Sequence, residues 1–117
     1  MTDNNKWSQS PLIPKDIQLI EDAQLSNLER HHLRLLAHCL ESFKRMANGS
    51  PSGPLPDERA RLQWCLDQPA LANEEAFISL LLEQFAVAAR QLENLAANCK
   101  TSPLELTVID LIEEMSR

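Results

Sequence analysis

Apolar residues recur along this chain with the spacing of amphipathic helices, in segments that proline and glycine separate. The strongest repeat lies in residues 26–48, where apolar positions follow a period near 3.6 residues. Plotted on a helical wheel, these positions cover an arc of about 160°, which is wider than one neighbouring helix can cover. We therefore predict that this segment is the central helix of the fold.

A second long helix is predicted over residues 73–99. Six apolar positions form a seam with alternating spacings of four and three: Leu81, Phe85, Ala88, Leu92, Leu95 and Cys99. Alanines beside the seam would let another helix approach closely. We expect the two long helices to pack antiparallel, and we expect a second copy to complete the remaining apolar surface, so that the protein is a homodimer.

Capping signals predict where several helices begin. Ser26 is followed by Glu29, and Ser102-Pro103 is followed by Glu105, which is the pattern of a hydroxyl cap with an acid three positions later. The second signal predicts a helix from Pro103 to Met115.

Shorter helices are predicted at 15–25 and 57–67, and residues 49–56 are rich in proline and glycine and form a loop. The expected fold is all-α, a compact bundle of four to five helices over residues 15–117. Residues 1–14 are predicted to be a flexible tail in which Trp7 is the largest apolar group.

Composition excludes several classes of protein. The 117 residues include only 2 glycines and no tyrosine, which disfavours an all-β fold. The formal net charge of −6 argues against nucleic acid or an anionic membrane as a partner. No secretory signal or membrane-spanning run is apparent, and three cysteines without a CxxC pair fit a reducing cytoplasm better than a disulfide framework.

Residues that could carry chemistry are few. His31 and His38, like His32 and Cys39, are seven positions apart, which on a helix is about 10.5 Å along the axis and too far for one metal ion. We therefore predict no catalytic residue, cofactor or metal. The alternative is a helical protein that binds a metal or small ligand, or a modest enzyme, using His32 and Cys39 with a carboxylate from a facing helix.

Two surface features point to protein binding. His31, Arg34, His38 and Arg45 fall within about 60° on the 26–48 helix and form a basic ridge. Residues 26–48 carry four basic and two acidic groups, whereas residues 101–117 carry one basic and four acidic groups. The ridge thus suits an acidic protein partner, or the acidic terminal helix of a second copy.

The second surface feature is Trp64 with Arg61. If Leu62 and Leu66 are the buried stripe of the 57–67 helix, Trp64 projects from its polar face beside Arg61. Tryptophan and arginine are enriched among the residues that dominate protein interfaces. The alternative is that another part of the same chain covers the indole ring.

The segment from Ser102 to Ile112 reads Ser-Pro-Leu-Glu-Leu-Thr-Val-Ile-Asp-Leu-Ile. Together with the short capped helices before it, this ending resembles small all-helical proteins of cyanobacteria and plastids, over residues 26–117. The resemblance implies a photosynthesis-associated accessory role in the cytosol and assigns no functional residue. The sequence as a whole predicts a non-catalytic interaction module, such as an adaptor, assembly factor or regulatory subunit.

Overall fold

The computed structural model describes residues 13–116, which form five α-helices and one short 3-10 turn. The elements are α1 (Pro14–Asp22), α2 (Asn27–Met46), α3 (Glu58–Asp67), α4 (Glu75–Cys99), η1 (Pro103–Glu105) and α5 (Val108–Met115). The described residues contain no strand, and the predicted all-α bundle is confirmed. Residues 1–12 of the expected tail, including Trp7, lie outside the described residues.

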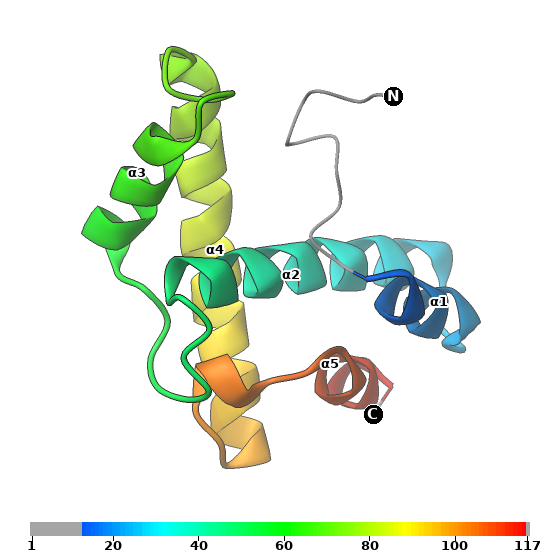
Figure 1. Cartoon of the computed structure of the whole chain (residues 1–117). Helices are drawn as coiled ribbons and strands as arrows, with labels where there is room; N and C mark the ends of the chain where they lie inside the picture. Colours follow the sequence, from blue (N-terminus) through cyan, green and yellow to red (C-terminus); the bar gives the residue numbers. More distant parts are fainter. Residues whose placement is uncertain (1–12, 117) are drawn as a thin grey trace.

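Helix α2 is central, as its broad apolar arc predicts. Its start is fixed by the expected capping box, in which the Glu29 amide donates to Ser26 Oγ at 3.1 Å and the Ser26 amide donates to the Glu29 carboxylate at 2.9 Å. Helices α1, α3, α4 and α5 all contact α2. Figure 1 shows α2 crossing the middle of the molecule, with α1 and α5 near its N-terminal half.

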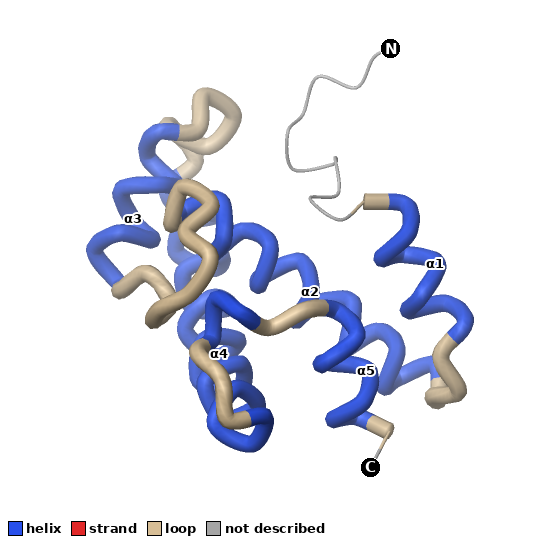
Figure 2. The backbone as a smooth tube through the Cα atoms, turned by 60° about the horizontal axis from the view of Figure 1, so that its bottom comes forward, coloured by secondary structure: helices blue, strands red, loops and turns tan. Residues whose placement is uncertain are grey.

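The arrangement of α2 and α4 differs from the expected antiparallel pair. Figure 1 shows the C-terminal part of α2 crossing the middle of α4, so that α4 extends beyond α2 on both sides, and Figure 2 shows the same crossing from another direction. The helix that runs antiparallel beside α4 is the shorter α3. The apolar seam of α4 still faces the core: Leu81, Phe85, Ala88 and Leu92 are buried.

Bulky aromatic rings fill the junction of α2, α3 and α4. The Phe85 ring lies 5.3 Å from the Phe43 ring and meets the Trp64 ring edge-on at 6.3 Å between centroids. The Arg61 guanidinium lies over the Phe43 ring, 5.5 Å from its centroid. Such aromatic and cation–π contacts stabilise a folded protein beyond the area they bury. They hold the helices together at one crossing point.

The prediction for the buried side of α3 is wrong. Leu62 and Leu66 are 41% and 45% exposed, while Cys65 is fully buried and Trp64 is half-buried against the core. Helix α3 carries apolar residues on both of these sides, so spacing alone does not identify the inner one. The neighbouring side chains determine which side of α3 is buried, because the rings of Phe43 and Phe85 lie on the side of Trp64 and Arg61.

The C-terminal segment also differs from the prediction of one helix from Pro103 to Met115. Ser102 Oγ donates to the Glu105 carboxylate at 2.7 Å and accepts from the Gly53 amide at 2.9 Å, and only a 3-10 turn follows. The chain then extends through Leu106, whose side chain is fully buried. Helix α5 begins at a second capping box, in which Thr107 and Asp110 cap each other's backbone amides.

The proline- and glycine-rich loop is tied to this turn. Besides the bond from the Gly53 amide to Ser102, the Leu104 amide donates to the Gly53 carbonyl at 3.2 Å. Gly53 has a φ of +117°, which favours glycine, and the neighbouring Leu55 is buried in the core. The loop therefore packs against the rest of the fold.

Candidate protein-interaction surface

A small apolar cleft opens where α2 crosses α4, with a volume of about 190 Å³. Helix α2 contributes Leu35, His38, Cys39 and Ser42 to its lining. Helix α4 contributes Phe77, Leu81, Gln84 and Phe85. We call this feature the α2–α4 cleft. It is smaller than the roughly 300 Å³ at which small-molecule sites begin, and its size suits a side chain of a docked protein segment.

Exposed apolar side chains extend the cleft along both helices. Leu35 and Phe77 line it and are themselves 37% and 43% exposed. Leu28, two turns before Leu35 on α2, is 79% exposed, and Leu80, one turn after Phe77 on α4, is 65% exposed. An apolar patch of this kind beside charged residues is typical of a protein-binding surface.

The predicted basic ridge borders the cleft on α2, but its charge is smaller than the sequence suggests. Its four members lie on the exposed or half-buried side of α2, and His38 lines the cleft itself. The Arg34 guanidinium forms an ion pair with the Glu21 carboxylate of α1, which compensates part of the positive charge.

Burial shifts the pKa values of two titratable groups that line the cleft, His38 and Cys39. Partial burial, together with the nearby charge of Arg34, lowers the pKa of His38 below its usual value of 6.5, so the imidazole is neutral at pH 7. Burial raises the pKa of the Cys39 thiol to about 11, so the group is protonated. At pH 7 the cleft therefore presents a neutral imidazole and a protonated thiol.

Trp64 and Arg61 are engaged within the chain. Besides its position over Phe43, Arg61 donates from Nε to the Pro56 carbonyl at 2.9 Å. Trp64 contacts Phe85 and remains half-buried. This corresponds to the alternative in which the same chain covers the indole ring, and a binding role for either residue stays a prediction.

The metal-binding alternative finds no matching geometry in residues 13–116. Cys39 is buried, and burial raises the pKa of its thiol to about 11, which disfavours the thiolate form that a metal binds. His32 is half-buried on the same helix. Within the described part of the chain, no group of three or more histidine, cysteine, aspartate or glutamate residues is placed to hold a metal ion.

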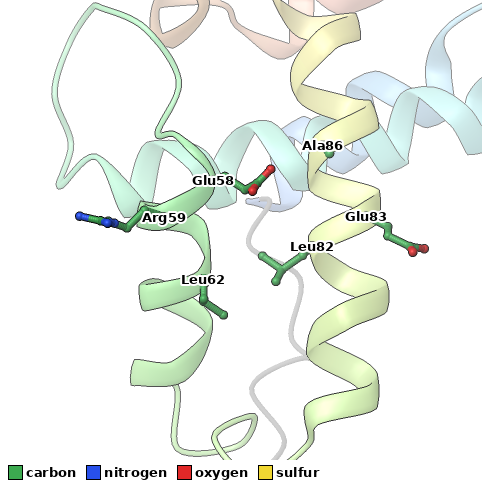
Figure 3. A pocket seen from close by; sticks show the side chains of 6 residues that line it. All are labelled: Glu58, Arg59, Leu62, Leu82, Glu83 and Ala86. Carbon is green, nitrogen blue, oxygen red and sulfur yellow. The ribbon is translucent and has the colours of Figure 1, made fainter.

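A second hollow, which the sequence did not predict, lies between α3 and α4. It has a volume of about 470 Å³ and is lined by Glu58, Arg59, Leu62, Leu82, Glu83 and Ala86. Figure 3 shows Leu62 and Leu82 facing one another across it, with Arg59 and Glu83 directed outward on its two sides. We call this feature the α3–α4 groove.

The sequence carried a partial signal for the α2–α4 cleft. Phe77 and Leu80 lie off the apolar seam of the 73–99 helix, and Leu28 and Leu35 lie at one edge of the broad arc of the 26–48 helix. Apolar residues beyond what one neighbour can bury indicate a further partner. Their convergence at one cleft depends on the crossing of α2 and α4, which local patterns do not encode.

Together, the helical fold and the exposed apolar and charged surfaces define a small all-α protein with the features of an interaction module. The sequence matches the family described as NDH complex assembly factor CRR9 over residues 12–117, and the chain belongs to this family. Comparisons with curated proteins and with solved structures gave no match. Across residues 13–116, no helix has the length and apolar character needed to cross a membrane.

Proposed function

We propose that this protein is a non-catalytic assembly factor that binds a protein component of the NDH complex before that complex is complete. The observation that carries the proposal is membership of the CRR9 family over residues 12–117, in a chain that exposes an apolar cleft beside a basic ridge. An assembly factor acts by holding surfaces of unassembled subunits, and exposed apolar side chains supply the contact area for this.

The binding surface that we propose is the α2–α4 cleft together with the ridge of His31, Arg34, His38 and Arg45. An apolar side chain of the partner would enter the cleft, and Leu28 and Leu80 would extend the contact on either side. Acidic residues of the partner would then lie near the ridge. Because Arg34 is already paired with Glu21, such charges would direct orientation and association rate more than affinity.

Three further predictions from the sequence bear on the proposal. The sequence predicted that Trp64 and Arg61 contact the partner directly; because both side chains are engaged at the helix junction, we propose instead that they support the binding surface from within the fold. We also propose that the protein works as a homodimer and that it acts in the cytoplasm.

The test is complementation of cells that lack this protein. Leu28→Ser and Leu80→Ser, alone and together, remove exposed apolar groups of the cleft surface without disturbing the core. Ile109→Ser is the matched control, because Ile109 is a 51% exposed apolar residue on α5, and Figure 1 shows α5 on the other side of α2 from the N-terminal half of α4. Native gels measure the assembled NDH complex, and immunoblots measure the variant itself.

We expect the control to restore the assembled complex and the double variant to fail at equal protein abundance. Full restoration by the double variant would exclude the cleft as the working surface. Normal accumulation of the complex in cells that lack the protein would contradict the assembly role itself.

A further inference from the structure

We propose that the α3–α4 groove is the homodimer interface, with a second copy of this chain related by a two-fold axis that runs along the groove. The proposal specifies the dimer suggested above and concerns a different surface from the α2–α4 cleft. In Figure 3, α2 lies behind α3 and α4, so the groove opens on the face that is turned away from α2. A dimer formed there leaves the cleft open to another protein.

The apolar side chains of the groove in one copy are complementary in shape to those of the same groove in a second copy. Leu62 and Leu66 protrude from α3 with 41% and 45% of their surface exposed, while α4 presents the half-buried Leu82 and the small side chain of Ala86. A two-fold axis along the groove places α3 of each copy over α4 of the other. Each Leu62 then packs into the hollow that Leu82 and Ala86 form in the second copy, as in an antiparallel four-helix arrangement.

Of the three charged residues that line the groove, Arg59 and Glu83 complement each other across the proposed axis. Within residues 13–116, the side chains of Glu58, Arg59 and Glu83 make no ion pair or hydrogen bond. Figure 3 shows Arg59 on the outer side of α3 and Glu83 on the outer side of α4, at a similar height along the groove. The proposed axis brings each Arg59 next to Glu83 of the second copy, which gives two symmetric ion pairs.

The positions of Arg59 and Glu83 favour a two-fold axis along the groove and a second copy of this chain as the molecule that binds there. A two-fold axis across the groove would instead place Arg59 next to Arg59 and Glu83 next to Glu83, which is repulsive. In an isologous interface the same patch meets itself, so it must present both signs of charge at exchangeable positions. The unpaired Arg59 and Glu83 on opposite sides of one apolar groove meet this requirement.

The experiment is a paired charge reversal, read out by light scattering after size exclusion. At about 100 µM, wild type is expected at twice the chain mass of 13.2 kDa, since a dimer with a Kd near 1 µM is then almost fully formed. Arg59→Glu places two glutamates side by side across the interface, and Glu83→Arg places two arginines there. Each variant alone should dissociate with a Kd at least ~10-fold higher than wild type.

The decisive sample is a mixture of the two variants. In a heterodimer of the Arg59→Glu chain with the Glu83→Arg chain, both rim pairs again have opposite charges, so the mixture should regain the dimer mass. The double variant, which carries both reversals on one chain, should also dimerise. Glu113→Arg is the control, because Glu113 is an exposed carboxylate of α5, outside the groove, and its reversal should leave the dimer intact.

Both reversed side chains are exposed, and circular dichroism verifies that each variant keeps its helical fold. Leu62→Ala gives a second measurement that introduces no charge and should also weaken the dimer. A monomeric wild type at about 100 µM, or a mixture that stays as dissociated as the separate variants, would overturn the proposal. Neither result affects the complementation test, because that test changes only the cleft surface.

Discussion

Replacing Trp64 by alanine distinguishes a packing residue from an interface anchor. Truncation of a fully buried tryptophan to alanine costs about 3–5 kcal/mol, and Trp64 is half-buried, so about 2 kcal/mol is expected from lost packing. Loss of the edge-on contact with Phe85 adds ~0.5–1.5 kcal/mol. The free energy of unfolding should therefore fall by about 3 kcal/mol.

The assay is thermal and urea unfolding, followed by circular dichroism because the substitution removes a fluorescent residue. Unfolding entropy is about 2.1 cal/mol/K per residue, so for 117 residues a loss of ~3 kcal/mol lowers Tm by about 12 °C. Gln63→Ala, on the exposed side of α3, is the control and should change the free energy of unfolding by less than ~0.5 kcal/mol.

The opposite pattern would refute this reasoning. If Trp64→Ala leaves Tm within about 2 °C of wild type but abolishes binding to an NDH complex component, the indole ring is a direct partner contact. The contact with Phe85 would then contribute little to stability.

Three further predictions follow from local contacts. Thr107→Ala removes the cap of α5 and should lower the free energy of unfolding by about 1 kcal/mol in urea titrations, and an unchanged midpoint would show that the cap is dispensable. Cys39 is buried and its pKa is raised to about 11, so at pH 8 mass spectrometry should find it alkylated far more slowly in the native protein than in urea; equal rates would contradict its burial. Burial and Arg34 lower the pKa of His38 in the folded state, so the unfolded state binds the proton more tightly. The free energy of unfolding should therefore decline as pH falls below about 6.5. His38→Gln should reduce that decline, and an identical pH dependence in the variant would contradict the role of His38.

Local signals in the sequence predicted most of the helices. The capping box of Ser26 and Glu29 sets the start of α2, and the spacing from Leu81 to Leu92 gives the buried seam of α4. The same signal failed at Ser102, because the hydroxyl is bonded to the Gly53 amide across 49 positions of sequence. A capping pattern within four neighbouring residues gives no information about a hydrogen bond from a residue that is distant in the sequence.

The candidate surfaces are formed by the packing of the helices against one another. The spacing of apolar residues along the sequence does not predict this packing. Leu62 and Cys65 are both apolar, and only the position of the Phe43 and Phe85 rings determines which of them faces the core. Likewise, Leu35 and Phe77 form one cleft only because α2 and α4 cross. Patterns along one helix describe its own faces, whereas a binding surface is made by how two helices meet.

Site-specific photo-crosslinking in cells tests most directly whether the α2–α4 cleft binds a component of the NDH complex. A photoreactive residue replaces Leu28 or Leu80 in one set of strains and Ile109 in another, and mass spectrometry identifies the crosslinked proteins. We predict that NDH complex subunits are recovered from positions 28 and 80, and that position 109 gives few or none. Recovery of these subunits from position 109 alone, or from none of the three positions, would contradict the account.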